Sequence, residues 1–283
     1  MTKINNMTEL VTQPVTLAQI SDTHLLADKS ALLRGRNPWL SLSAVLQQAI
    51  AAQPDGLLLS GDLAERGELA AYENVRTAIF AAQRQGDRPV KDGVTDTALD
   101  LPIYWLPGNH DDLAAMKSAF QSPCFRGLQA INLGTWQLIL LDSVLPQAQV
   151  GEGRLSSAAL DWLHLELCQH PDKPTIVALH HHPVPVSIDW VDQMQVQNAD
   201  ELLAILDVFP QVKLVSFGHI HFEFQHQRQR SNRPSIAFYG CPSTHLQIDA
   251  TANHRSPGFR LIHLHADGTH QTQVCWLPLE DEQ

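Results

Sequence analysis

The residues best suited to do chemistry in this chain are seven potential metal ligands in five short blocks. Each block comes at the end of an apolar run with the character of a strand. Carboxylate, amide and imidazole groups together suit divalent ions such as Mn, Fe or Zn. Two such ions, roughly 3.5–4 Å apart, hold the attacking and leaving oxygens of an in-line displacement at phosphorus. The pattern therefore predicts a dinuclear metal centre with the ligands Asp22, His24, Asp62, Asn109, His180, His219 and His221.

The first two blocks each have a second interpretation. Asp22 and His24 stand two residues apart after a strand-like run, so they reach one site only if the chain turns there. Otherwise they form a hydrogen-bonded pair at the surface. Asp62 follows Gly61 and a buried strand, and glycine permits a backbone conformation that swings the next carboxylate over the strand ends. Asp62 either bridges two ions with its two oxygens or caps the next helix.

The block Gly108-Asn109-His110 is more specific. The amide oxygen of Asn109 is an uncharged ligand for a hard ion, and the neighbouring imidazole of His110 stays free to handle a proton. Asp111 and Asp112 are expected to cap the following helix. The block therefore predicts one ligand and one catalytic acid.

The last two blocks hold five histidines. Because side chains alternate along a strand, only one or two of His180, His181 and His182 can face the same side. His180 is favoured as the ligand, with His181 as the alternative, and His182 is expected to have a structural or supporting role. His219 and His221 are expected to place both rings on one face of an extended segment.

The blocks are positioned by strands that alternate with helices, followed by a strand-rich end. This order predicts two packed sheets flanked by helices. The polar segment 85–101 is expected to be a surface loop, with an active-site lid as the alternative. A hairpin is expected to turn at Gly134. Strands are expected at 15–20, 57–60, 103–106, 174–183, 212–221, 236–240, 259–268 and 269–277, and helices around 42–50, 68–84, 113–120, 156–167 and 199–210.

The composition restricts the class of protein. With 44% hydrophobic and 17% charged residues among 283, the chain has the balance of a globular protein. No apolar run reaches the 18 or more residues of a transmembrane helix, and the polar start lacks a signal core. Four scattered cysteines indicate free thiols and a reducing cytoplasm. A net charge of -11 argues against a nucleic-acid partner. We expect a cytoplasmic protein with a flexible tail at 1–14 and one domain at 15–283.

The order D-x-H, GD, GNH, H and GHxH resembles that of the calcineurin-like metallophosphoesterase superfamily. The segments ISDTHL, WLPGNHD, LLDS, ALHHHPVP, SFGHIH, CPST and LHADGT further resemble the bacterial class III 3′,5′-cyclic-nucleotide phosphodiesterases of the Icc type. The resemblance extends from Leu17 to about Gly268. It implies an α/β fold, a four-layer αββα sandwich of two mixed sheets flanked by helices. It also implies an iron–manganese pair, with Zn, Co or Mg as other options.

The same resemblance implies a role for each matching residue. The first metal would be held by Asp22, His24, Asp62 and His221. The second would be held by Asp62, Asn109, His180 and His219, with Asp62 shared. Contacts to the substrate are implied for His24, Asp62, Asn109, His110 and His221. The long 85–101 segment and the polar N-terminal extension depart from the family pattern, which leaves substrate preference and assembly open.

The resulting hypothesis is a phosphodiesterase that converts 3′,5′-cyclic AMP to 5′-AMP. A metal-bridging hydroxide would attack in line, Asn109 would help to stabilise the phosphoryl charge, and His110 would protonate the departing oxygen. One alternative is a phosphodiesterase or phosphatase with broader specificity for nucleotides or other phosphoesters. Another is a binding scaffold that has lost catalysis, although the sequence retains every ligand.

The base of a nucleotide would need side chains outside the metal blocks. Trp190 could stack on adenine, but packing against the protein is the favoured alternative. His245 could line the cleft or stand in solvent. The expected partner is a small cyclic nucleotide, and the oligomeric state is left open, with a homodimer as one option.

Overall fold

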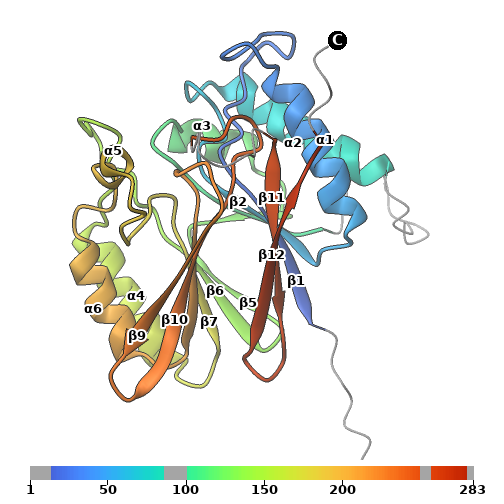
Figure 1. Ribbon diagram of the computed structural model, residues 1–283. Coiled ribbons are helices and arrows are strands. Elements are labelled where there is room, and N and C mark those ends of the chain that lie inside the picture. Colours follow the sequence, from blue (N-terminus) through green and yellow to red (C-terminus); the bar gives the residue numbers. More distant parts are fainter. Residues whose placement is uncertain (1–13, 86–100, 249–255, 279–283) are drawn as a thin grey trace, which may run out of the picture.

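Two six-stranded sheets pack face to face in the computed structural model, which describes residues 14–85, 101–248 and 256–278 (Figure 1). Along the first sheet the strands are β12 (His270–Trp276), β11 (Gly258–Leu264), β1 (Val15–Ile20), β2 (Gly56–Ser60), β3 (Ile103–Leu106) and β4 (Phe125–Gly127). Along the second they are β5 (Ala130–Leu133), β6 (Trp136–Leu140), β7 (Thr175–Ala178), β8 (Val212–Phe217), β10 (Arg233–Gly240) and β9 (Phe224–Arg230).

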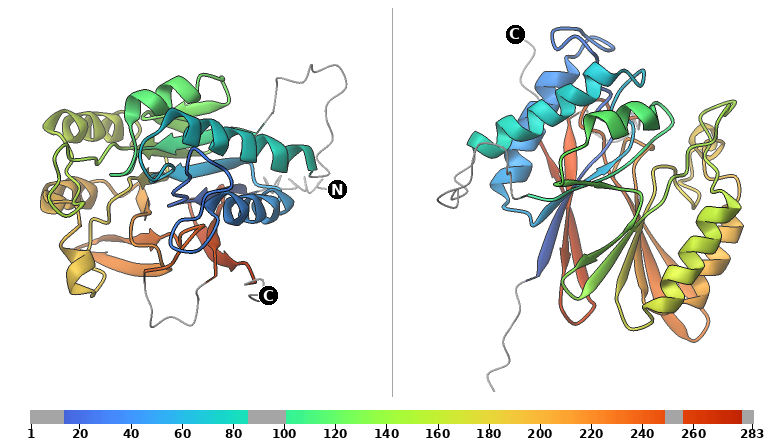
Figure 2. Two further views of the ribbon diagram at one scale, coloured as in Figure 1. Left: turned by 90° about the horizontal axis from the view of Figure 1, so that it is seen from above. Right: turned by 180° about the vertical axis from the view of Figure 1, so that it is seen from behind.

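Helices cover the outer face of each sheet, which gives the four layers expected from the sequence (Figure 2). Those packed on the first sheet are α1 (Pro38–Ala51), α2 (Leu69–Gln85) and α3 (Leu113–Ala119). Those packed on the second are α4 (Ser157–Gln169) and α6 (Ala199–Val208), with the short α5 (Asp189–Asp192) in the loops at one end. The predicted αββα sandwich is confirmed.

The apolar runs are continuous because the central strands are buried on both faces. In β2, Leu57 and Leu59 pack under the helices, whereas Leu58 packs between the two sheets. Helices α1, α3 and α4 begin at a side-chain cap. In α4 the side chain of Ser156 accepts from the backbone N–H of Ala159.

The central strands of each sheet run parallel, so their carboxyl ends lie together at one edge. This holds for β1, β2 and β3 in the first sheet and for β6, β7, β8 and β10 in the second. Ligands in open α/β sheets bind outside the carboxyl ends of the strands. The chemically interesting blocks all follow such ends.

Several sequence expectations need correction. Strand β7 ends at Ala178 and β8 at Phe217, so the histidines lie in loops beyond the strands. The C-terminal strands also divide between the sheets: β10 joins the second, while β11 and β12 join the first. Strand β10 pairs in parallel with β8 and antiparallel with β9, an edge strand that the sequence does not predict because its polar residues give no buried face. The hairpin that turns at Gly134 is confirmed.

Other expectations remain as predictions. The tail at 1–14 and the segment 85–101 fall almost wholly outside the described residues, and the extent of the domain stays a prediction. The four cysteines lie in described parts of the chain and are free. Within those parts, every helix is too short or too polar to cross a membrane.

Candidate metal centre

Four of the predicted ligands gather beyond the ends of β1, β2 and β8. One potential ligand atom from each of Asp22, His24, Asp62 and His221 lies within 4.8 Å of the others. The Nε2 atoms of His24 and His221 are 3.1 Å apart, and Nε2 of His221 is 3.3 Å from Oδ1 of Asp22. We call these four residues the first group. It matches the set that the resemblance implies for one ion.

A second group joins the first through Asp62. Ligand atoms of His180, His181 and His219 lie within 4.8 Å of one another. Nε2 of His180 is 3.3 Å from Oδ2 of Asp62, and Nε2 of His24 is 3.9 Å from the same oxygen. The carboxylate of Asp62 thus stands between the two groups, where a shared ligand would be placed.

The backbone turns sharply at the site, and this brings the side chains together. Asp22, His24, Asp62, His219 and His221 all have positive φ, between 45° and 69°. Such non-glycine conformations are costly and persist only where surrounding contacts enforce them. The expectation of an extended segment at His219 and His221 is therefore wrong: the turn directs His219 to the second group and His221 to the first.

The strand-alternation argument for the histidine run also fails, since the run begins beyond the end of β7. The rings of His180 and His181 both reach the second group, with centroids 5.0 and 4.6 Å from that of His219. Nδ1 of His180 donates to the carbonyl of Ser60, and Nδ1 of His181 lies 2.8 Å from Oγ of Ser143. Each ring therefore presents Nε2 toward the group.

Hydrogen bonds from the backbone hold the carboxylates in place. Asp22 accepts from the N–H of His219, and Oδ1 of Asp62 accepts from the N–H of His110 at 2.9 Å. The first contact ties the two sheets together, because Asp22 follows β1 and His219 follows β8. The alternative in which Asp62 caps a helix is not observed.

Asp111 does not cap α3, contrary to expectation; Asp112 alone does so, accepting from the N–H of Ala115. The carboxylate of Asp111 instead fastens the loops that carry Asp62 and Asn109. Its donors are the N–H groups of Leu63, Ala64 and Gly108 and the hydroxyl of Tyr72. Burial, reinforced by the charge of Asp62, raises the pKa of Asp111 to about 6.

Glu65 is a functional candidate that sequence reasoning missed. Its carboxylate accepts from Nδ1 of His24 at 2.8 Å, and its carbonyl accepts from Nδ1 of His110 at 2.9 Å. The hydrogen bond from His24 is the main cause of the lowered pKa of Glu65. The only signal in the sequence is an acidic residue three places after Asp62, in a loop without periodicity.

The electrostatics keep the carboxylates ionised despite their burial. Burial raises the pKa of Asp22, but His221 and His180 together outweigh it and leave the pKa below its ordinary value. Burial likewise opposes ionisation of Asp62, yet His180, together with His24 and His110, holds its pKa well below normal. Burial acts in the other direction on His181 and His219 and lowers their pKa values well below 6.5. Burial opposes protonation of His180 as well, but Asp62 and Asp22 outweigh it and raise its pKa to about 9. The rings of His181 and His219 are therefore already in the neutral state that binds a metal, whereas His180 would release a proton when a metal binds.

Unpartnered buried atoms provide a direct test of whether metals fit. Among the described residues, Oδ1 of Asn109 and Nε2 of His180, His181 and His219 are buried without a hydrogen-bond partner. Buried polar atoms are normally satisfied, so a cluster of four requires an explanation. Metal ligands point their lone pairs at one site in this way. A set of imidazole nitrogens and an amide oxygen suits Mn, Fe or Zn.

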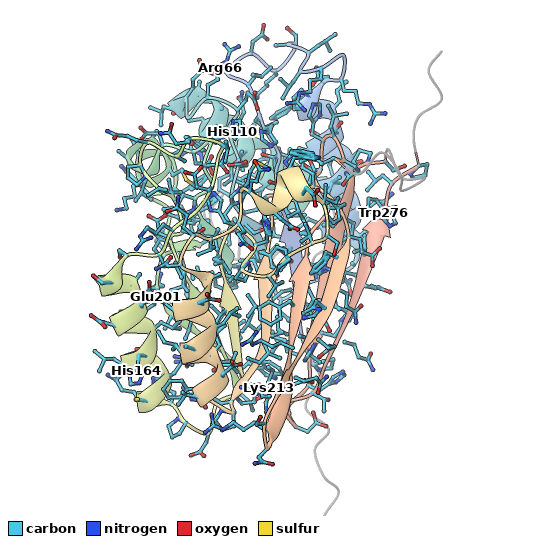
Figure 3. All side chains as sticks on the ribbon, turned by 60° about the vertical axis from the view of Figure 1, so that its left-hand side comes forward. Arg66, His110, His164, Glu201, Lys213 and Trp276 are labelled. Atoms are coloured by element: carbon cyan, nitrogen blue, oxygen red, sulfur yellow. The ribbon has the colours of Figure 1, made fainter. Side chains whose placement is uncertain are left out.

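A cavity of about 220 Å³ opens on the first group. His219 lies on its wall, and so do the five residues predicted to contact the substrate: His24, Asp62, Asn109, His110 and His221. His110 lies among the loops at the same end of the molecule as Arg66 (Figure 3).

Two residues singled out for base contact also lie on the cavity wall. His245 is buried, and its Nε2 donates to the carbonyl of Leu33. Trp190 is 52% exposed, so the expectation that it packs against the protein is wrong.

Comparison with known proteins identifies the family. Residues 15–223 match the calcineurin-like phosphoesterases. The chain belongs to this family. A 3′,5′-cyclic-nucleotide phosphodiesterase from Nostoc sp. is 38% identical over 272 residues, which cover 94% of this chain and 93% of that one. The 3′,5′-cyclic adenosine monophosphate phosphodiesterase CpdA of Escherichia coli is 37% identical over 268 residues, covering 92% and 89%.

Two solved structures share the fold of this chain. A dimetal phosphatase from Danio rerio aligns with a TM-score of 0.63 and 13% identity, over 89% of this chain and 93% of that one. A protein of Thermus thermophilus aligns with a TM-score of 0.57 and 12% identity, over 93% and 99%. At these low sequence identities, the similarity is one of fold alone.

Proposed function

We propose that this protein is a dinuclear-metal phosphodiesterase that hydrolyses 3′,5′-cyclic AMP to 5′-AMP. The observation that carries the proposal is the pair of adjoining groups of ligand side chains, joined at Asp62 and open to a cavity. The named activities of the relatives from Nostoc and Escherichia coli support the choice of substrate.

The proposed ligands follow from the two groups. One ion would be held by Asp22, His24, Asp62 and His221, and the other by Asp62, Asn109, His219 and a histidine of the 180–182 run. When bound, such a pair activates water and neutralises charge on the phosphoryl oxygens; iron and manganese are the proposed ions. Both His180 and His181 present a buried, unpartnered Nε2, so either can complete the second set. We retain His180, because it is the one next to Asp62.

His110 is placed to act as the general acid. Its Nδ1 donates to the carbonyl of Glu65, which leaves Nε2 as the atom that holds and gives a proton. Its side chain is 38% exposed, on the cavity wall, so the ring can reach a substrate oxygen. The carboxylate of Glu65 also lies 3.7 Å from Nδ1 and helps to hold the ring in this orientation. We propose that His110 passes its Nε2 proton to the departing 3′ oxygen.

Two further residues prepare the site for a phosphoester. His24 is oriented by the hydrogen bond from its Nδ1 to Glu65, which fixes the tautomer and frees Nε2. The backbone N–H of His110 is held by Asp62, and this fixes the loop that presents Asn109 to the same cavity. These residues would position the phosphoryl group before the reaction. Such preorganised groups typically supply the largest share of the rate enhancement.

The test is a time course on 3′,5′-cyclic AMP after Mn²⁺ or Fe²⁺ is added to metal-stripped protein. We expect 5′-AMP to form only when a divalent ion is present. Failure to release 5′-AMP with any metal would overturn the substrate assignment. Comparable rates on 2′,3′-cyclic nucleotides and bis(p-nitrophenyl) phosphate would favour an enzyme of broader specificity instead. Full metal occupancy without hydrolysis of any phosphodiester would indicate a binding scaffold.

A further inference from the structure

About half of the residues that line the cavity take no part in the proposed metal binding or proton transfer. Beside the ligand groups, the wall is formed by a set of mainly apolar side chains: Leu33, Val150, Trp190, Met194, Leu246 and Ile248. Water and a phosphate group need no such surface. Val150 and Trp190 are also among the most exposed large hydrophobic residues of the described chain, at 54% and 52%. Exposed apolar surface at the rim of a polar site indicates contact with an apolar part of a ligand.

Trp190 is held in its exposed position by the structure around it. It lies on α5, whose next residue, Val191, is fully buried and anchors the turn. Asp192 accepts from the backbone N–H groups of Val186 and Ser187, at 2.7 and 3.1 Å, and so ties α5 to the preceding loop. The indole is therefore presented on a braced element and does not depend on a long mobile loop.

The opposite loop is braced as well. Leu33 and Arg36 exchange backbone hydrogen bonds across a two-residue turn, in which Arg34 and Gly35 have positive φ. Nε2 of the buried His245 donates to the carbonyl of Leu33 and holds this turn against the cavity. Since this loop follows β1 and α5 follows β7, one braced segment from each sheet contributes to the apolar wall (Figure 1).

We propose that the indole of Trp190 stacks on the nucleobase of the substrate, within this apolar wall. The inference rests on the proposed function. In a cyclic nucleotide the base is joined to the phosphate through one ribose, so a phosphate at the ligand groups places the base in the same cavity. Stacking on an aromatic side chain is tolerant of sequence because every base has a π face. The wall therefore selects for a base and discriminates little between bases, and 3′,5′-cyclic GMP is a substrate of the same site.

The decisive comparison uses two substrates that differ only in the base. These are 3′,5′-cyclic AMP and methyl ribofuranoside 3′,5′-cyclic phosphate, which keeps the sugar and the cyclic phosphate. Base stacking contributes roughly tenfold or more in affinity per base. We expect the wild type to favour cyclic AMP by at least about tenfold in kcat/KM, and to treat cyclic GMP within about tenfold of cyclic AMP. Hydrolysis of both compounds is followed by ³¹P NMR.

Three variants then test whether the preference for cyclic AMP over the abasic compound depends on Trp190. Trp190→Ala is expected to lose most of the preference for cyclic AMP while its rate on the abasic compound stays within about twofold of wild type. Trp190→Phe keeps an aromatic face and should retain most of the preference. Leu165→Ala removes an equally exposed apolar side chain on α4, outside the cavity wall, and serves as the control. Equal losses on both substrates in Trp190→Ala, or an unchanged ratio, would overturn the proposal.

A binding measurement separates this proposal from that of the function. Titration of 5′-AMP should quench tryptophan fluorescence in the wild type, and the quench should be lost in Trp190→Phe with five tryptophans still present, one fewer than the six of the chain. If the quench depends on Trp190 but no metal supports hydrolysis of cyclic AMP, the base site stands and the phosphodiesterase assignment fails. A quench that persists in Trp190→Phe would place the base elsewhere.

Discussion

At the scale of single residues, fixed hydrogen bonds give the neighbouring residues Asn109 and His110 different roles in the site. Asn109 offers an unpartnered amide oxygen, whereas His110, the next residue, has its Nδ1 committed to the carbonyl of Glu65. One side chain is thus disposed to bind a metal and the other to carry a proton. Two adjacent residues can serve different steps because the loop that holds them is fixed by Asp62 and Asp111.

Because Asn109 and His110 have different roles, we expect His110→Ala to slow turnover and to leave metal binding unchanged. General acid catalysis typically contributes about 10²–10⁴-fold, so kcat on cyclic AMP should fall by that factor. On bis(p-nitrophenyl) phosphate, whose leaving group needs little protonation, the loss should be much smaller. Metal content measured by elemental analysis should match that of the wild type. A variant that lacks one metal ion would show instead that His110 is a ligand.

Asp111 predicts a pH dependence of stability in the metal-free protein. Its pKa is about 6 in the folded state and 3.8 as the ordinary value, so between these pH values the folded form binds the additional proton. Stability from this group therefore falls as pH rises from about 4 through 6, by at most about 1.4 kcal/mol per unit, and levels off about one unit above 6.

The measurement is urea unfolding of wild type and Asp111→Asn from pH 4 to pH 8. The amide cannot titrate, so the difference in free energy of unfolding, wild type minus variant, should decrease as pH rises through 6 and stay constant above about pH 7. The lost hydrogen bonds add an offset that does not change with pH. A difference that rises with pH would contradict the raised pKa.

At the scale of elements, each ligand depends on how a strand ends. Strand β2 ends at Ser60, and Gly61 follows with φ of +91°. A Cβ at Gly61 would overlap Nδ1 of His180 and would lie 2.8 Å from the backbone nitrogen of Gly108. Absence of a side chain here allows three strand ends, β2, β3 and β7, to converge.

Gly61→Ala is expected to damage both stability and metal binding. Left-handed strain costs about 1–2 kcal/mol, and forced contacts in a packed region cost roughly 1–3 kcal/mol more. Gly35→Ala is a matched control, because Gly35 has φ of +82° but open space around its Cβ. Only the strain should then be lost, without effect on bound metal. Chemical unfolding and metal analysis measure the two effects; equal losses in both variants would show that convergence at Gly61 is unimportant.

The sequence alone was sufficient for the strands and their blocks because burial leaves a pattern. The runs before Asp22 and Asp62 are apolar for the simple reason that both faces of their strands are covered. Backbone turns leave no comparable pattern, so the positive φ of His219 and its separation from His221 were not foreseen. Glu65 was missed for a similar reason: its role comes from a loop that folds back onto His24, and a loop residue has no periodicity.

At the scale of the whole molecule, the two sheets contribute to one centre. Asp22, Asp62 and Asn109 follow strands of the first sheet, whereas His180 and the histidines at 219 and 221 follow strands of the second. The layer between the sheets is mainly apolar, with residues such as Leu58 and Leu214. The buried side chain of Gln19 crosses it, donating to the carbonyl of Phe217 and accepting from the hydroxyl of Ser216. Metal ions at this edge would connect the sheets where hydrophobic packing ends.

This arrangement predicts that divalent ions stabilise the entire fold. A ligand at 100 times its Kd adds about 2.7 kcal/mol to the free energy of unfolding. For a protein of this size about 1 kcal/mol corresponds to roughly 2–4 °C, so Mn²⁺ should raise the Tm of stripped protein by about 5–10 °C. The shift should arise as one cooperative transition observed by circular dichroism, because both sheets are joined at the same site.

Ligands from either sheet should be equally necessary for that shift. Asp62→Asn removes a ligand from the first sheet and His219→Ala one from the second, and each should abolish most of the rise in Tm. His226→Ala removes an exposed histidine on β9 and should leave the rise intact. If His219→Ala kept the full shift while Asp62→Asn lost it, the ions would bind to the first sheet alone. The stabilisation would then be local, and the centre would not couple the two halves of the sandwich.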